Sequence, residues 1–196
     1  MHFLENKLYH IYNQGNNKQL IFFSNNNYSF FLNKYKQLIA PHVDTLAYCL
    51  MPNHFHFLVN TNEKSVQEIK VGSLTLSALS NGIRLLLSSY ATAINKQQNS
   101  TGSLFRQKTK SKNLENGSVN YVATAFHYIH QNPLEAGLVT SLRDWEYSSF
   151  KDYIGLRNGN LCNQNLAKKL IDVNWNDLEN ETYAFYKNKK EINEIF

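Results

Sequence analysis

Residues 51–59 of this chain, Met-Pro-Asn-His-Phe-His-Phe-Leu-Val, place two histidines two positions apart in a strand-forming stretch. The proline and asparagine favour a turn, and the aromatic and β-branched residues after them favour a strand. Because successive strand side chains point to opposite faces, His54 and His56 share one face, and Phe55 and Phe57 share the other. If the aromatic face is buried, both imidazoles are presented together, close enough to bind one metal ion.

More strands are expected beside this one. Residues 7–13 should form a strand that is buried on both faces and therefore central, and residues 43–50 should form another. The strand 43–50 is joined to the strand 54–60 by a short turn, so these two should pair as an antiparallel hairpin. Residues 104–112 are expected to form a fourth strand.

Residues at helical spacing fall in three stretches, 25–40, 76–94 and 118–132. The third should start at Ser118, a residue type that caps helices, and should stop before Pro133, because the residue before a proline disfavours helical dihedrals. Its apolar stripe, expected to face the sheet, consists of Val119, Val122, Phe126 and Ile129. These strands and helices together predict a compact α+β fold with an antiparallel sheet.

The composition narrows the class of protein. At 196 residues, 42% of them hydrophobic, the chain is long and apolar enough for one domain with a sizeable core. It has no apolar run of about 18 residues, so no transmembrane helix is expected, and its start lacks the basic-then-apolar order of a signal peptide. The two cysteines, Cys49 and Cys162, lie far apart, which favours a reduced, cytoplasmic protein. The net charge of +5 gives weak support for a polyanionic partner.

One basic stretch has a regular spacing. Arg106, Lys108, Lys110 and Lys112 alternate with polar residues, so in an extended segment all four cations project from one side. This spacing suits a phosphate backbone. It equally suits a solvated edge strand in which lysines prevent aggregation. The stretch by itself favours neither interpretation.

The histidine pair by itself is more often structural than metal-binding. Two ligands are too few for a structural zinc site, so a metal here would keep open positions for water and substrate. A third ligand would come from elsewhere, and Tyr128 and Asn132 lie four apart, on one face of a helix. In the competing interpretation Tyr128 is an ordinary half-buried aromatic residue and Asn132 ends the helix.

Several segments resemble one known family. The two main ones are Leu50–Val59 (LMPNHFHFLV) and Tyr128–Val139 (YIHQNPLEAGLV), and shorter ones are Tyr9–Asn13, Gly102–Arg106 and Trp145–Phe150. In this order they resemble the REP-associated tyrosine transposases, which are single-tyrosine transposases with a His-hydrophobic-His motif. The resemblance covers residues 1–150, expected to be the catalytic domain. Residues 151–196 are expected to be a C-terminal extension that packs on it.

The resemblance implies a ferredoxin-like antiparallel sheet with helices packed on one face, and single-stranded or hairpin DNA as the substrate. It implies that Tyr128 attacks a phosphodiester and keeps the 5′-phosphate as a phosphotyrosine. A divalent metal, Mg or Mn, would be held by His54, His56 and Asn132. The DNA would be contacted by Arg106, Lys108, Lys110, Lys112 and Tyr12.

Some alternatives stay open at this point. Gln131 or His130 could supply the third ligand in place of Asn132. His10 or His130 could hydrogen-bond to the ligating residues without binding the metal. Many relatives carry an arginine where this chain has Gln14. The competing functions are a non-catalytic nucleic-acid-binding regulator and a metal-dependent hydrolase that activates water. The protein could act as a monomer or a homodimer.

Overall fold

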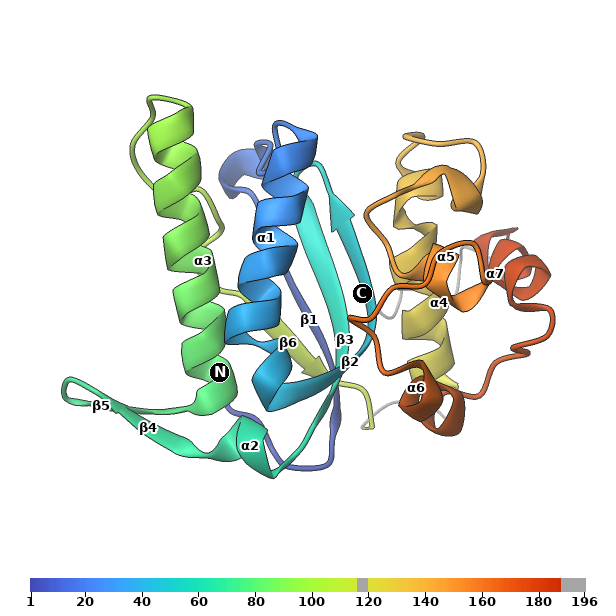
Figure 1. The fold of residues 1–196 in the computed structure, drawn as a ribbon, viewed down its shortest axis with the longest axis horizontal. Helices are drawn as coiled ribbons and strands as arrows, with labels where there is room; N and C mark the ends of the chain where they lie inside the picture. Colours follow the sequence, from blue (N-terminus) through green and yellow to red (C-terminus); the bar gives the residue numbers. More distant parts are fainter. Residues whose placement is uncertain (116–119, 188–196) are drawn as a thin grey trace.

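A four-stranded antiparallel sheet lies at the centre of the computed structural model, which describes residues 1–115 and 120–187 (Figure 1). Its strands, in the order β2-β3-β1-β6, are β2 (Val43–Met51), β3 (His54–Thr61), β1 (Leu8–Gln14) and β6 (Lys110–Asn113). The predicted hairpin is confirmed, since β2 and β3 pair antiparallel with Met51 opposite His54. The strand 7–13 is central, as predicted, because β1 lies between β3 and β6.

Two helices cover one face of this sheet, α1 (Asn25–Leu38) and α3 (Ala78–Gln97). The aromatic side of β3 packs under α1, with ring centroids 5.2 Å apart for Phe31 and Phe55 and 4.1 Å apart for Tyr35 and Phe57. The order β1-α1-β2-β3-α3-β6 is the ferredoxin-like arrangement. The predicted α+β fold, an antiparallel sheet with helices packed against it, is confirmed.

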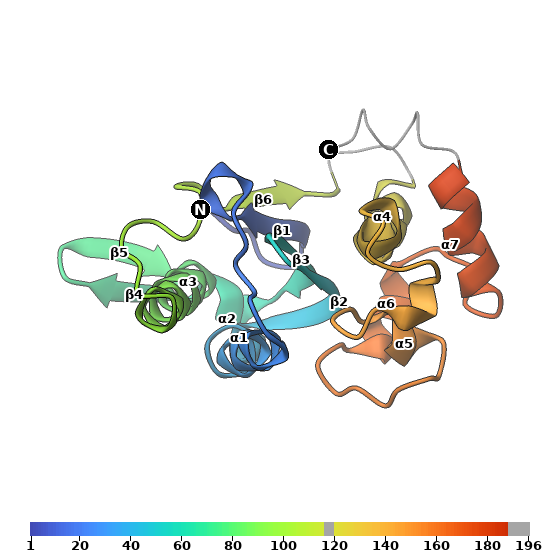
Figure 2. The same ribbon diagram turned by 90° about the horizontal axis from the view of Figure 1, so that it is seen from above.

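Helix α4 (Tyr121–Glu135) lies on the other face of the sheet, beside β2 and β3, as Figure 2 shows. This face carries the histidines. Directly paired residues of neighbouring strands point to the same face of a sheet, so the partners of the histidines on β1 lie there too. Tyr12 pairs with His56, and Gln14 pairs with His54. The sheet thus has an apolar face under α1 and α3 and a polar, histidine-bearing face under α4.

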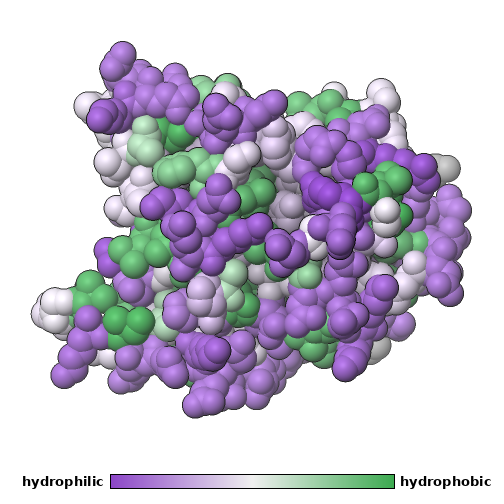
Figure 3. Space-filling view, in the orientation of Figure 1, coloured by the Kyte–Doolittle hydropathy of each residue, from purple (hydrophilic) through white to green (hydrophobic). Residues whose placement is uncertain are grey.

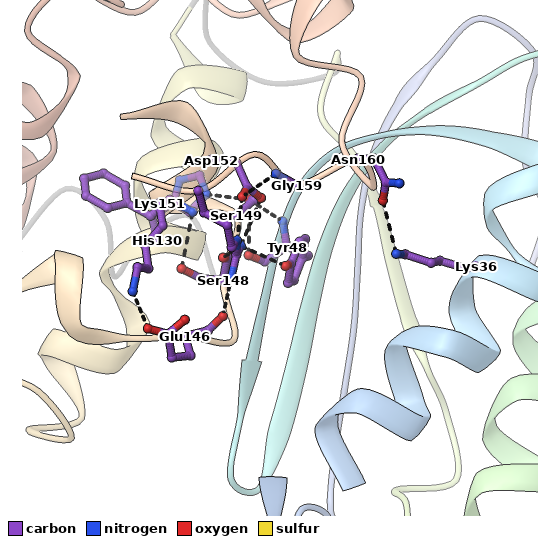
Figure 4. A network of polar contacts seen from close by, with 12 residues as sticks. Lys36, Tyr48, His130, Glu146, Ser148, Ser149, Lys151, Asp152, Gly159 and Asn160 are labelled. Atoms are coloured by element: carbon purple, nitrogen blue, oxygen red, sulfur yellow. Dashed lines mark hydrogen bonds and ion pairs between the residues drawn. The ribbon is translucent and has the colours of Figure 1, made fainter. Parts of the chain in front are cut away.

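The C-terminal segment packs on the outer side of α4 and along β2. Its helices are α5 (Phe150–Tyr153), α6 (Gln164–Leu170) and α7 (Leu178–Lys187). Figure 4 shows the polar network that joins it to β2, in which the buried carboxylate of Asp152 accepts hydrogen bonds from Arg157 and from the Gly159 amide. Arg157 also donates to the Tyr48 hydroxyl at 3.1 Å. The segment after residue 150 is therefore in direct contact with the sheet.

A second, two-stranded sheet projects from the body between α2 (Glu63–Val66) and α3. Its strands are β4 (Glu68–Val71) and β5 (Leu74–Ser77), joined by a turn in which Gly72 has a φ of +60°. Apolar side chains gather over this hairpin at the lower left of Figure 3, and Leu74 is 62% exposed. No helix in the described part of the chain is long and apolar enough to span a membrane.

Two expected element boundaries are wrong. The fourth strand covers only 110–113 and not 104–112, because the side chain of Asn13 on β1 donates to the Arg106 carbonyl at 3.2 Å and to Thr109 Oγ1 at 3.0 Å. These bonds hold residues 106–109 in a loop in place of ladder pairing.

Helix α4 also runs through Pro133 to Glu135 instead of ending at Asn132. A proline at 133 cannot donate to the Ile129 carbonyl. The Asn132 amide compensates by donating to the carbonyls of Tyr128 at 2.8 Å and Ile129 at 3.5 Å. Of the expected apolar stripe, Phe126 packs on Tyr153 and Trp175 of the C-terminal segment. Ser118 and Val119 lie outside the described residues.

Candidate metal and nucleic-acid site

An open pocket of about 420 Å³ lies where α4 crosses the ends of β1 and β3. It is lined by Tyr12, Asn13, Gln14, His54, His56, Arg106, Lys108, Lys110 and Tyr128. The described lining residues include three cations and no carboxylate. The pocket therefore offers imidazole, phenol and positive charge to a ligand, which suits an anion better than a cationic or apolar molecule.

Helix α4 brings two polar side chains to the histidine pair. The amide oxygen of Asn132 lies 3.3 Å from Nε2 of His54. The ring of Tyr128 stands edge-on to the ring of His56, with centroids 5.6 Å apart. The two histidine rings are themselves 4.9 Å apart. The structure thus brings together all four of the residues from which the sequence predicts a metal and nucleophile site, across more than seventy positions of chain.

The donor atoms present suit a divalent metal. Nε2 of His56 is buried and has no hydrogen-bond partner among the described residues, and His56 is the pocket-lining residue among the four histidines with such a nitrogen. His54 Nε2 and the Asn132 amide oxygen complete a set of two nitrogens and one oxygen. No group of three or more His, Cys, Asp or Glu side chains within residues 1–115 and 120–187 could hold a metal. The amide oxygen is therefore an essential member of this set.

The electrostatics of the pocket keep the histidines neutral and the phenol protonated. Burial lowers the pKa of His54, and it lowers the pKa of His56 well below its usual range. Neutral imidazoles are the form that binds metals. Burial also raises the pKa of Tyr128 to about 12, and the negative charge of Glu135 adds to this. A nearby cation would favour the phenolate and oppose that rise.

The alternatives for the third ligand face away from the pocket. His130 Nε2 lies 2.8 Å from the Ser149 hydroxyl, a contact labelled in Figure 4, and Gln131 donates to the Thr182 carbonyl at 2.6 Å. Gln131 thus contacts the C-terminal segment, and so does His130, whose ring lies 6.0 Å from that of Tyr153 between centroids. His10, by contrast, lies behind the histidine pair, with its Nε2 2.8 Å from Nδ1 of His56. Of the two residues expected to hydrogen-bond to the ligands, His10 does so and His130 does not.

The basic stretch divides in two. Arg106, Lys108 and Lys110 line the pocket, whereas Lys112 lies over the ring of Tyr121, 4.9 Å from its centroid. A second groove of about 730 Å³ runs from the same loop along α3 and adds a fourth cation, Arg84. Sequence reasoning missed this groove, because Arg84 lies on a helix with no basic spacing to mark it.

Comparison with known proteins adds a structural match only. No protein-family model and no curated protein sequence matches the chain significantly. Among solved structures it is similar to a REP-associated tyrosine transposase bound to a REP hairpin, with a TM-score of 0.59 and 14% sequence identity. The match covers 80% of this chain and 86% of that one. At this identity the likeness concerns the fold, and the chain therefore has the fold of a REP-associated tyrosine transposase.

Proposed function

We propose that this protein is a DNA transposase that cleaves and rejoins single-stranded, hairpin-associated DNA through a 5′-phosphotyrosine on Tyr128. One observation supports the proposal: Tyr128 and Asn132 of α4 lie against His54 and His56, beside a pocket lined with cations. The likeness to a transposase that binds a REP hairpin supports the same class of substrate.

The chain's own residues would hold a divalent metal, Mg or Mn, through Nε2 of His54, Nε2 of His56 and the amide oxygen of Asn132. When bound, the metal would polarise the scissile phosphate and stabilise charge on the leaving oxygen. The three protein ligands leave positions open for that phosphate. The neutral state of both histidines at physiological pH agrees with this role.

Tyr128 is the nucleophile in this proposal. Its phenolic oxygen forms a bond to phosphorus while the bond to the 3′-oxygen breaks, and the phenolic proton leaves with the released 3′-hydroxyl or with water. The reverse attack by a 3′-hydroxyl rejoins DNA without an external energy source, since the phosphodiester bond energy is kept. The high pKa of Tyr128 makes the positive charge of the site necessary for its reactivity.

The cations beside the pocket would bind the DNA strand. Arg106, Lys108 and Lys110 would contact phosphates next to the scissile bond, and Tyr12 offers an aromatic face for an unpaired base. Arg84, in the groove that continues from the same loop, would extend this contact along an unpaired strand. Lys112 was also predicted to contact the DNA. It is less available for that contact because it lies over the ring of Tyr121.

The proposal is tested by incubating the protein with Mn²⁺ and a labelled single-stranded hairpin from the DNA that flanks its gene. We expect a covalent protein–DNA adduct that migrates as one labelled band on a denaturing gel. Tyr128→Phe should remove the adduct while it preserves hairpin binding. Binding without any adduct, insensitive to a chelator and to His56→Ala, would instead favour a non-catalytic regulator. Cleavage that survives Tyr128→Phe would favour a hydrolase.

A further inference from the structure

We propose that His10 and Asn53 are positioning residues, each of which accepts a hydrogen bond from Nδ1 of one pocket histidine and so directs its Nε2 lone pair to the metal position. The inference rests on the proposed function, because it assigns the metal-facing atoms of that site. It concerns neither a ligand nor the nucleophile but the two contacts behind the ligands.

The contact of Asn53 fixes the proton on His54. His54 Nδ1 lies 2.6 Å from the amide oxygen of Asn53. The Asn53 amide nitrogen donates to the Lys18 carbonyl at 3.3 Å, which sets which end of the amide faces the imidazole. An amide oxygen can only accept, so His54 must carry its proton on Nδ1. In the neutral imidazole Nε2 then holds a lone pair.

That lone pair faces a second acceptor. The Asn132 amide nitrogen donates to the Tyr128 carbonyl at 2.8 Å, which turns the amide oxygen toward His54 Nε2, 3.3 Å away. Two acceptors at this distance repel each other unless a positive charge or a proton lies between them. A metal ion between the two atoms would satisfy both, since each would direct a lone pair at it.

The contact of His10 concerns the position of the proton on His56, as that of Asn53 does for His54. His10 Nε2 and His56 Nδ1 lie 2.8 Å apart in the buried interior, and one of the two must donate. If His56 donates, its buried Nε2 is a lone pair that a metal can use. If His10 donates, His56 Nε2 carries a hydrogen that no described residue accepts. Either arrangement leaves a ring hydrogen on a buried nitrogen, on Nδ1 of His10 in the first and on Nε2 of His56 in the second. Only the first leaves a lone pair for the metal of the proposed function, and that makes His10 the acceptor.

The sheet and the turn hold both contacts in place. The His10 ring packs against both Tyr12 and His56, with centroid distances of 4.7 Å and 5.0 Å, and those two rings are 5.7 Å apart. The Asn53 backbone carbonyl accepts from the Gly15 amide at 2.8 Å, so the turn is fixed to the loop after β1. Strand β1 and the loop after it therefore hold the two positioning residues of the proposed metal site, although they contribute no ligand.

The experiment combines two measurements on the metal-free and Mn²⁺-titrated protein. Long-range ¹H–¹⁵N NMR of histidine-labelled protein should show His54 and His56 as Nδ1–H tautomers before metal is added. Calorimetry should then show that His10→Phe and Asn53→Ala weaken Mn²⁺ binding about 10- to 100-fold. His10→Gln, which restores an acceptor oxygen, should recover most of the affinity.

Controls separate this inference from the proposed function. His42→Gln changes a histidine at Ala40–His42, outside the pocket, and should bind Mn²⁺ as the wild type does. Tyr128→Phe should keep the tautomers and the Mn²⁺ affinity while it loses the DNA adduct. An Nε2–H tautomer in either pocket histidine, or unchanged Mn²⁺ affinity in variants with wild-type near-ultraviolet circular dichroism, would overturn the inference alone. A wild-type protein that binds no Mn²⁺ would overturn the metal site and this inference together.

Discussion

The two faces of helix α4 carry similar polar residues and use them differently. On the face toward the sheet, Tyr128 and Asn132 meet the histidine pair in an open pocket. On the opposite face His127, His130 and Gln131 are buried against the C-terminal segment. His127 Nδ1 lies 2.9 Å from the Thr182 hydroxyl, and its ring stacks on Phe185 with centroids 4.3 Å apart.

The difference lies in what each polar group faces. Most groups of the outer face meet hydroxyls, carbonyls and a carboxylate of the protein itself, the last being Glu181, 3.5 Å from His127 Nε2. Two of its ring nitrogens, Nε2 of His127 and Nδ1 of His130, have no hydrogen-bond partner among the described residues. On the inner face, the amide oxygen of Asn132 faces Nε2 of His54, and Tyr128 lines the open pocket. Buried polar groups with protein partners stabilise a packed interface, whereas converging acceptors require a ligand. We therefore assign structural roles to the outer face and binding roles to the inner one.

Substitutions in the pocket that the inner face of α4 meets, and substitutions on its outer face, should have opposite consequences. The effect on cleavage is the largest expected. His54→Ala or His56→Ala should reduce adduct formation by about three orders of magnitude or more, because the metal position loses a ligand, while hairpin affinity stays within a few fold. His130→Ala should leave the adduct yield intact and lower the free energy of unfolding by about 1–3 kcal/mol, because the buried Ser149 hydroxyl loses one of its hydrogen-bond partners and keeps those of Tyr48. Quantitative gel assays and urea denaturation measure the two effects. Loss of cleavage in a folded His130→Ala protein would contradict the division.

Acid should lower the free energy of unfolding through the histidines on the outer face of α4. Burial lowers the pKa of His127 to about 4 and that of His130 to about 3, whereas both titrate near 6.5 in the unfolded chain. Between these values the unfolded chain binds more protons, so stability is fully present above pH 6.5 and falls as the pH drops toward 4. Each histidine should contribute a slope of about 1.4 kcal/mol per pH unit in that window. Urea denaturation at pH 7 and pH 5 measures this, and His127→Gln should reduce the slope by about one proton. An unchanged slope would show that His127 does not stay neutral in the folded protein.

The smallest expected effect is on DNA affinity, and it concerns the cations that line the pocket beside the inner face of α4. Lys108→Gln should weaken binding to a single-stranded oligonucleotide several fold and should lower the slope of log affinity against log salt by about 0.7, because one phosphate contact is lost. Lys34→Gln is the matched control, because this lysine lies over Phe30 of α1 and outside the pocket. Fluorescence anisotropy at several salt concentrations measures both variants. Equal slopes for the wild type and Lys108→Gln would remove Lys108 from the DNA path.

The local patterns of the sequence were enough to place each half of the site. The strand period of two put His54 and His56 on one face and the apolar core residues on the other, and the helical spacing put Tyr128 and Asn132 together. The short turn after Met51 was enough to predict the hairpin. These features depend on dihedral angles and spacing within a few residues, which a single sequence shows directly.

Only the tertiary structure decided which side chains the halves present to each other. The sequence left Asn132, Gln131 and His130 as candidates for the third ligand, and the tertiary structure selects among them by giving His130 and Gln131 other partners. The contact of His10 with His56 depends on the pairing of β1 with β3. The loop at 106–109 depends on the side chain of Asn13, some ninety residues earlier. Such contacts join residues far apart in the chain, and their energies depend on burial and register, which no local period encodes.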